Sequence, residues 1–255
     1  MSVSKMLWVW ILAGVVGAAP ASARPGHDDA APGTCRVSDS LVLAGPSDSG
    51  AVALTFDACP TRRAPGFSPE ILATLQREHV PATVFVSGRW AEAHASALQA
   101  LTATPDLEVA LHGHRHRHLN GATAAAIAAE IEAGRQALLG LGVTPVPFFR
   151  PPYGEHPAAL AAAARLAGVT PVLWDVAPGD PDSQVTAADI ERSVLGQARA
   201  GSIVVLHING RGVGTAAALP VVIAGLRARG LQFVSLSDLL RRCPPAAEDA
   251  HAARH

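Results

Sequence analysis

The sequence predicts an α/β protein, built as an irregular (β/α) barrel of about seven parallel strands. Short apolar segments alternate with segments of helical periodicity along the 255-residue chain, which is the repeat of a parallel sheet covered by helices. Chemically reactive side chains fall directly after the apolar segments, and a barrel brings such strand ends around one mouth. An open doubly wound sheet would carry a glycine-rich phosphate loop in its first turn, where this sequence has none.

The expected strands are short, apolar and rich in β-branched residues. They are 51–56, 82–86, 107–111, 146–149, 169–174, 202–206 and 232–235. The expected helices show apolar residues every three or four positions or carry terminal signals, such as the Ser68–Pro69 start and the Gly230 stop. They are 68–78, 90–102, 123–141, 158–166, 187–200 and 216–229, with a final turn at 238–242.

Length and charge restrict the class of protein. With 255 residues, of which 49% are hydrophobic, the chain can form one sizeable α/β domain with short extensions. We expect this domain at 48–242, and we expect a monomer. The 20 basic and 21 acidic residues nearly cancel, so nothing in the sequence indicates a nucleic-acid partner or electrostatic attraction to a membrane.

The N-terminus has the pattern of a secretory signal peptide at 1–23. Lys5 precedes an apolar run at 6–19, and an Ala-Ser-Ala cleavage site ends at Ala23. We therefore expect a periplasmic or secreted protein with no stable membrane span after cleavage. A flexible lead-in is expected at 24–47 and a polar tail at 243–255.

The chain contains three cysteines, Cys35, Cys59 and Cys243. Cys35 and Cys243 bracket the expected domain, and an exported protein can keep disulfides. Our hypothesis is that these two pair and that Cys59 is free, although sequence alone does not fix connectivity.

A histidine-rich stretch follows the strand at 107–111. Histidines occupy positions 112, 114, 116 and 118. Imidazole is a good ligand for divalent transition metals, and histidines four residues apart can face one ion together. Since the stretch begins at a strand end, where α/β proteins place their sites, we expect a metal site here.

Five short motifs follow one another along the chain. They are Thr55-Phe-Asp57, His112-x-x-x-His116, Arg150-Pro-Pro-Tyr153, Trp174-x-Val-x-x-x-Asp180 and Leu206-His207. In order and spacing they resemble the motifs of NodB-like polysaccharide deacetylases, carbohydrate esterase family four, and the resemblance covers about 48–242. It implies a distorted barrel that hydrolyses a carbon–nitrogen bond to remove acetyl groups from an N-acetylated polysaccharide or oligosaccharide.

The resemblance also implies roles for single residues. Asp57 would be the general base, held by Arg150. His207 would be the general acid, tuned by Asp180. The backbone N–H of Tyr153 would bind the oxyanion. Amide hydrolysis needs each of these functions, because the amine must be protonated and the tetrahedral oxyanion stabilised.

The same resemblance assigns a divalent metal, expected to be zinc, to His112 and His116. The family's first motif reads Thr-Phe-Asp-Asp and takes its third metal ligand from the second aspartate, which is Ala58 in this chain. Catalytic zinc sites use three protein ligands, so two histidines leave the site incomplete. The candidates for the missing third ligand are Cys59 and Asp57, which we rank equally, followed by His114 or His118.

The fourth motif also departs from the family pattern. Pro181 follows Asp180 where tryptophan is common, and Ala177 fills a position that is usually polar. The acetyl pocket, which the resemblance places near Trp174 and Val205, is therefore expected to be reshaped. Asp175 is a second candidate partner for the general acid.

Two other functions compete with the deacetylase. The chain could be a catalytically inactive glycan-binding or regulatory module, or a hydrolase of another carbon–nitrogen or ester bond. The presence of a candidate base, a candidate acid and a partner for each favours an enzyme, because a binding module has no chemical need for them.

Overall fold

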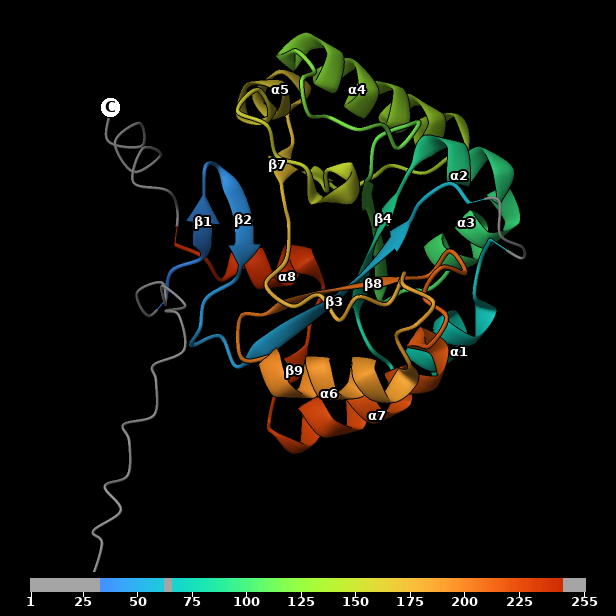
Figure 1. Ribbon diagram of the computed structural model, residues 1–255, viewed down its shortest axis with the longest axis vertical. Helices are drawn as coiled ribbons and strands as arrows, with labels where there is room; N and C mark the ends of the chain where they lie inside the picture. Colours follow the sequence, from blue (N-terminus) through green and yellow to red (C-terminus); the bar gives the residue numbers. More distant parts are fainter. Residues whose placement is uncertain (1–32, 62–65, 245–255) are drawn as a thin grey trace, which may run out of the picture.

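The computed structural model describes residues 33–61 and 66–244, and its centre is a curled sheet of seven parallel strands (Figure 1). The strand order is β7-β6-β5-β4-β3-β8, with β9 also paired to β3. The bounds are β3 Ala51–Ala58, β4 Ala82–Val86, β5 Leu107–Leu111, β6 Phe148–Phe149, β7 Thr170–Pro171, β8 Ile203–His207 and β9 Gln232–Phe233. The predicted α/β fold and the seven predicted strands are confirmed, although several strands are shorter than expected.

The sheet curls because the segment after β7 turns back toward β8. Val176 forms a single parallel bridge with Val204, and the amide of Val205 donates to the carbonyl of Val176 at 3.0 Å. This irregular contact joins the two ends of the strand order. The carboxyl ends of the strands consequently surround one region, as the sequence predicts for a barrel.

Helices cover the outside of the curled sheet (Figure 1). Their bounds are α1 Pro69–Arg77, α2 Gly88–Ala93, α3 Ala95–Thr102, α4 Ala124–Gly140, α5 Leu160–Ala167, α6 Ala187–Gln197, α7 Thr215–Ala228 and α8 Leu236–Arg241. Helices α4 and α5 pack together on one side, and α6 and α7 on another. The single helix expected at 90–102 is wrong: it is two helices, because the backbone of His94 leaves the helical region between them.

The central strand β3 is buried along its whole length. Both of its faces are covered, which explains why its sequence is a continuous apolar run rather than an alternating one. The Thr55 hydroxyl in the middle of this run donates to the carbonyl of Val204 at 2.7 Å. Trp90 is also buried, and its indole N–H donates to Gly66 at 2.7 Å, so this tryptophan belongs to the core.

The expected flexible lead-in is wrong for residues 36–44, which form an antiparallel hairpin of β1 (Arg36–Ser38) and β2 (Leu41–Ala44). Leu41, Val42 and Ala44 are buried, and the amide of Leu173 donates to Val42 at 2.8 Å. Apolar burial and this hydrogen bond fix the hairpin to the barrel. The predicted signal peptide and most of the predicted tail lie outside the described residues.

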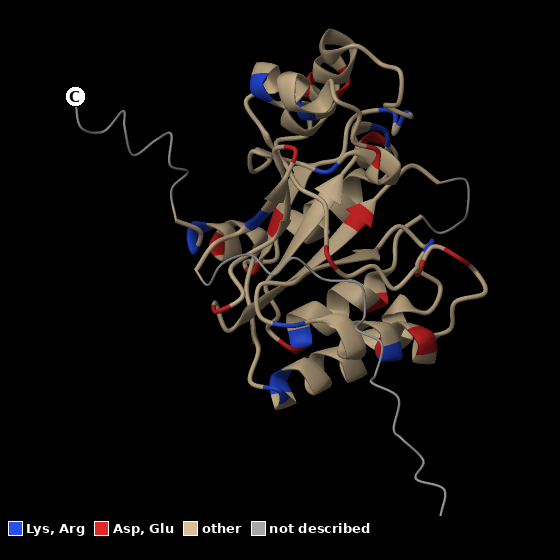
Figure 2. Cartoon of the chain, turned by 60° about the vertical axis from the view of Figure 1, so that its left-hand side comes forward, with Lys and Arg blue, Asp and Glu red and all other residues tan. Residues whose placement is uncertain are grey.

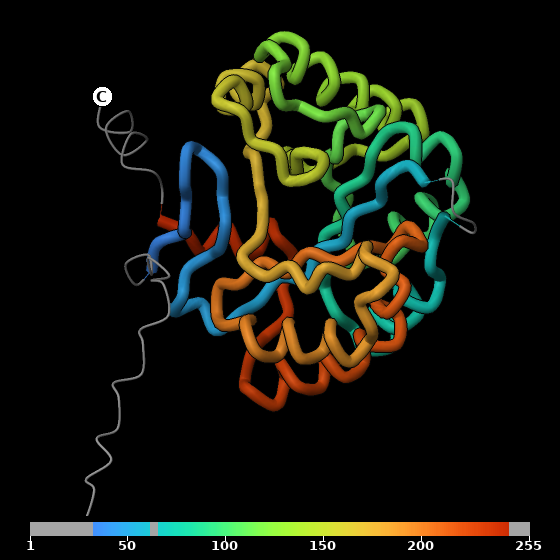
Figure 3. The backbone as a smooth tube through the Cα atoms, viewed as in Figure 1, coloured from blue at the N-terminus to red at the C-terminus, as the bar shows by residue number. Residues whose placement is uncertain are grey.

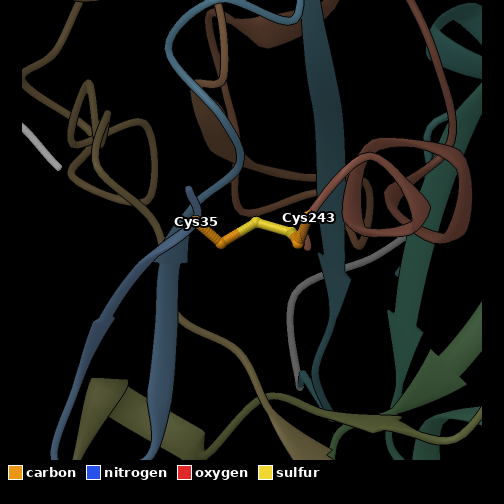
Figure 4. The surroundings of a disulfide bond; sticks show 2 residues. All are labelled: Cys35 and Cys243. Atoms are coloured by element: carbon orange, nitrogen blue, oxygen red, sulfur yellow. A yellow bond between two sulfur atoms is a disulfide. The ribbon is translucent and has the colours of Figure 1, made fainter. Parts of the chain in front are cut away.

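A disulfide joins the hairpin to the end of the fold, as hypothesised. Cys35 and Cys243 are bonded across 208 residues of sequence, with their Cα atoms 5.4 Å apart (Figure 4). Cys59 is free and buried. The tube in Figure 3 shows the blue hairpin beside the red C-terminal segment, which the disulfide links covalently.

Acidic and basic residues are mixed over the outer helices (Figure 2). None of the helices in the described part of the chain is long and apolar enough to cross a membrane.

We expect the Cys35→Ser, Cys243→Ser double variant to lose about 2–5 kcal/mol of unfolding free energy, because the disulfide restricts a very long loop in the unfolded chain. Denaturant unfolding of oxidised protein measures this loss. A reductant should lower the stability of the wild type by a similar amount and leave the double variant unchanged. Equal stability of the two oxidised proteins would contradict the prediction.

Candidate active site

A cavity of about 250 Å³ lies at the carboxyl ends of the strands. It is lined by side chains from the loops after several strands, as expected for a barrel site. Nearly all the site residues expected from sequence line it: Asp57, Cys59, His112, His116, Tyr153, Asp180 and His207. Trp174 and Val205, expected near an acetyl group, line it as well. Arg150 lies behind this surface and is fully buried.

Arg150 holds Asp57 in place. Its Nη1 donates to the Asp57 carboxylate at 2.8 Å, and its Nη2 donates to the carbonyl of Leu173 at 3.1 Å. The guanidinium lies over the ring of Phe85, 4.0 Å from its centroid. Burial alone would raise the pKa of Asp57, but neighbouring positive charges, Arg150 first among them, hold it below its ordinary value. The carboxylate is therefore ionised and fixed in direction.

His207 stands directly beside Asp57. It is the last residue of β8, and the parallel pairing of β3 with β8 places Asp57 opposite His207. Asp180 receives the backbone N–H of His207 at 2.7 Å and pairs with its Nδ1 at 2.9 Å. Burial alone would lower the pKa of His207, but hydrogen bonding to Asp180 and nearby negative charge raise it to about 10. The imidazole is thus protonated and able to act as an acid.

The alternative prediction, that Asp175 is the partner of His207, is wrong. Its carboxylate receives the amide of Ile203 at 2.8 Å and the hydroxyl of Ser202 at 3.0 Å. Arg36 lies 3.8 Å away, so Asp175 links the N-terminal hairpin to the barrel instead of facing the cavity.

Three potential metal ligands meet at the cavity. Cys59, His112 and His116 each offer one ligand atom, and these three atoms lie within 4.8 Å of one another. The Sγ of Cys59 is 3.6 Å from the Nε2 of His112. The Nδ1 of His112 lies 2.8 Å from the carbonyl oxygen of Arg150. Because a carbonyl only accepts, Nδ1 carries a proton, so Nε2, which faces Cys59, is the nitrogen that could bind a metal.

The state of the Cys59 thiol suits a metal too. Burial alone would raise its pKa, but hydrogen bonding to surrounding histidines, His112 first among them, holds the pKa well below its ordinary value. A cysteine sulfur with two imidazoles is a donor set typical of zinc. The residues present therefore fit a divalent metal with three protein ligands.

The other proposed third ligands lie less favourably. One carboxylate oxygen of Asp57 is 3.7 Å from the Nε2 of His112, but the other is held by Arg150. His114 lies against Gly88 at the start of α2, and His118 pairs with Glu155 at 2.6 Å. Among the described residues, neither of these two histidines belongs to the ligand cluster.

Backbone strain marks the rim of the cavity. Tyr153, within the one-turn 3₁₀ helix at Pro152–Gly154, has a φ of 59°, and His116 has a φ of 57°. Non-glycine residues in such conformations cost roughly 1–3 kcal/mol each and are found preferentially at functional sites. The surrounding contacts must therefore hold both residues in place.

Four residues that support the site were not predicted from sequence. The Thr215 hydroxyl donates to Asp180 at 2.7 Å, and the Asn209 side chain donates to the carbonyl of Cys59 at 2.8 Å. Glu130 and Glu155 accept hydrogen bonds from the histidine-rich loop. Asn209 lies two residues after His207 and Glu155 two residues after Tyr153, and this proximity was the available signal.

Comparison with known proteins gives the family. The sequence profile of the polysaccharide deacetylase family matches residues 44–172. The chitooligosaccharide deacetylase of Rhizobium leguminosarum bv. trifolii is 31% identical over 202 residues, which cover 74% of this chain and 92% of the relative. The bifunctional xylanase/deacetylase of Pseudobutyrivibrio xylanivorans is 28% identical over 188 residues, and the match covers 74% of this chain but only 30% of that relative.

A solved structure agrees with the sequence matches. The crystal structure of the peptidoglycan N-acetylglucosamine deacetylase Bc1960 aligns with a TM-score of 0.71 and 29% identity, covering 78% of this chain and 92% of that one. A shared fold is thus accompanied by a family match over half of the sequence. This chain belongs to the polysaccharide deacetylase family.

Proposed function

We propose that this chain is an exported, metal-dependent hydrolase that removes acetyl groups from an N-acetylated glycan. The observation that carries the proposal is the meeting of three groups at one cavity. These are the ionised Asp57, the protonated His207 opposite it, and the ligand cluster of Cys59, His112 and His116. Base, acid and metal site are the parts that amide hydrolysis needs.

Cys59, His112 and His116 would hold the metal, which we propose to be zinc. When bound there, a divalent ion supplies Lewis acidity, which polarises a carbonyl and makes water more acidic. Three protein ligands would leave one coordination position open, as in catalytic zinc sites.

The protein's own groups then divide the remaining work. Asp57 removes a proton from the water that attacks the acetyl carbon, and Arg150 keeps the carboxylate aimed. The backbone N–H of Tyr153 donates to the oxyanion that forms. The carbon–nitrogen bond then breaks as His207 delivers its proton to the leaving amine. Acetate and the free amino sugar are the products.

The apolar side of the cavity suits the methyl group of the acetyl. Trp174, Ala177, Pro181 and Val205 line the same cavity as His207. Ala177 and Pro181 are the positions that depart from the family pattern, so they shape this side of the pocket differently from the common arrangement.

Two observations support the substrate class and the export. Two of the relatives act by name on chitooligosaccharides and on N-acetylglucosamine of peptidoglycan, and these substrates share an N-acetylated sugar. The Cys35–Cys243 disulfide is typical of a protein that folds in an oxidising compartment, in agreement with the predicted signal peptide.

We expect Asp57→Asn to lower kcat by about 10²–10⁴-fold, because the amide cannot accept the proton from water. Acetate release from N-acetylated chitooligosaccharides and peptidoglycan fragments measures kcat, and binding of the same glycans should persist. Turnover that survives in Asp57→Asn would contradict the mechanism. A wild type that binds these glycans without releasing acetate would support the inactive binding module instead.

We expect Gly212→Ala to weaken the acid. A Cβ at Gly212 would lie 2.5 Å from a carboxylate oxygen of Asp180 and 2.7 Å from the carbonyl of His207, so this pair must shift. The variant should lose about 1–3 kcal/mol of unfolding free energy from overpacking and at least half of its kcat.

Gly196→Ala is the matched control, because the added methyl in α6 meets open space. It should gain up to about 1 kcal/mol, since alanine favours helix more than glycine does, with kcat unchanged. If Gly212→Ala kept both the stability and the kcat of the wild type, this would contradict the prediction that tight packing around Asp180 positions His207.

A further inference from the structure

The loop that carries His116 has no helix or strand of its own. Residues 112–123, between β5 and α4, lie outside the regular elements, and we call 113–120 the metal loop. Gly113 and His116 both have left-handed φ values, of 73° and 57°. Because no helix or strand holds the loop, contacts from outside it fix where the His116 imidazole lies. Among them, the amides of Gly88 and Arg89 donate to the carbonyls of Gly113 and His114 at 3.0 Å.

Glu130 on α4 holds the N-terminal half of the metal loop. Its Oε1 accepts the backbone N–H of His114 at 2.9 Å and also that of Arg115. The helix can come this close because Gly134, one turn further along α4, leaves no side chain in the way: a Cβ there would lie 2.5 Å from the Gly113 carbonyl oxygen. One half-buried carboxylate thus binds two successive amides just before His116.

Glu155 holds the C-terminal half in the same manner. Its Oε2 accepts the backbone N–H of Leu119 at 2.6 Å and that of Asn120 at 3.1 Å. Its Oε1 lies 2.6 Å from the Nδ1 of His118. A second carboxylate therefore binds two successive amides just after His116.

Ring contacts connect this second attachment to the metal ligands. The His118 ring stacks on Tyr153 with centroids 4.1 Å apart and 10° between the planes. Tyr153 meets His116 edge-on at 4.5 Å, and His116 meets His112 at 4.8 Å. The His116 ring is thus confined between the two aromatic rings of Tyr153 and His112.

We propose that Glu130 and Glu155 are positioning residues that together clamp the metal loop and thereby set the metal affinity of the site. The two carboxylates accept backbone hydrogen bonds on either side of His116 and thereby keep His116 in its left-handed conformation. The inference rests on the metal site of the proposed function. Groups that orient metal ligands from outside commonly change metal affinity by about 10–100-fold when they are removed.

The test is zinc affinity of the mature chain, measured by competition with a chromophoric chelator, together with the absorption spectrum of the cobalt-loaded protein. Glu130→Ala and Glu155→Ala should each bind zinc about 10–100-fold more weakly, with an altered cobalt spectrum. Glu130→Asp and Glu155→Asp keep the charge but shorten the reach, so they should also weaken binding, and they replace any alanine variant that does not fold.

Two controls separate position from charge. Glu130→Gln keeps the one oxygen that accepts both amides and should bind zinc within about threefold of the wild type, since the geometry that orients the ligand is kept. Glu132→Ala removes an exposed glutamate of the same helix that pairs with Gln136 and Arg135, and should leave zinc affinity unchanged.

Wild-type zinc affinity in folded alanine and aspartate variants would overturn the clamp. A Glu130→Gln loss as large as that of Glu130→Ala would also overturn it, since charge rather than position would then matter. Failure of the proposed metal site would give a different result, because the wild type itself would then bind no zinc. That result would overturn both the metal site and the clamp.

Discussion

A fully buried arginine connects the parts of this site. The Arg150 side chain aims the Asp57 carboxylate, and its backbone carbonyl fixes the tautomer of His112. An unpaired charge at this depth would cost several kcal/mol, so the guanidinium requires both Asp57 and the carbonyl of Leu173. The candidate base and a candidate metal ligand are therefore oriented by one residue.

Cys59 directly follows the end of β3 and lines the same cavity as Asp57. Successive side chains of a strand point to opposite faces, so residues two apart share a face. Asp57 and Cys59 both line the cavity, whereas Ala58 between them belongs to the hydrophobic core. A sulfur one residue later thus stands beside the two histidines. A sulfur ligand at this position would leave Asp57 available as the base.

Much of the fold could be predicted because it depends on local pattern. The seven strands are apolar runs, and the disulfide joins two cysteines that bracket them. The hairpin at 36–44 was missed because its strands are too short to show a period. The third ligand could not be chosen, since Cys59 and His112 meet across 53 residues of sequence. Glu130 and Glu155 resemble ordinary surface glutamates until the loop they hold is seen.

The central claim is that Cys59 is the third metal ligand. X-ray absorption at the zinc edge of the zinc-loaded protein tests it most directly, beside Cys59→Ser. The account predicts one sulfur neighbour at about 2.3 Å and nitrogen or oxygen neighbours at about 2.0–2.1 Å in the wild type, with the sulfur shell absent in Cys59→Ser. A wild-type spectrum that contains nitrogen and oxygen neighbours alone would contradict it.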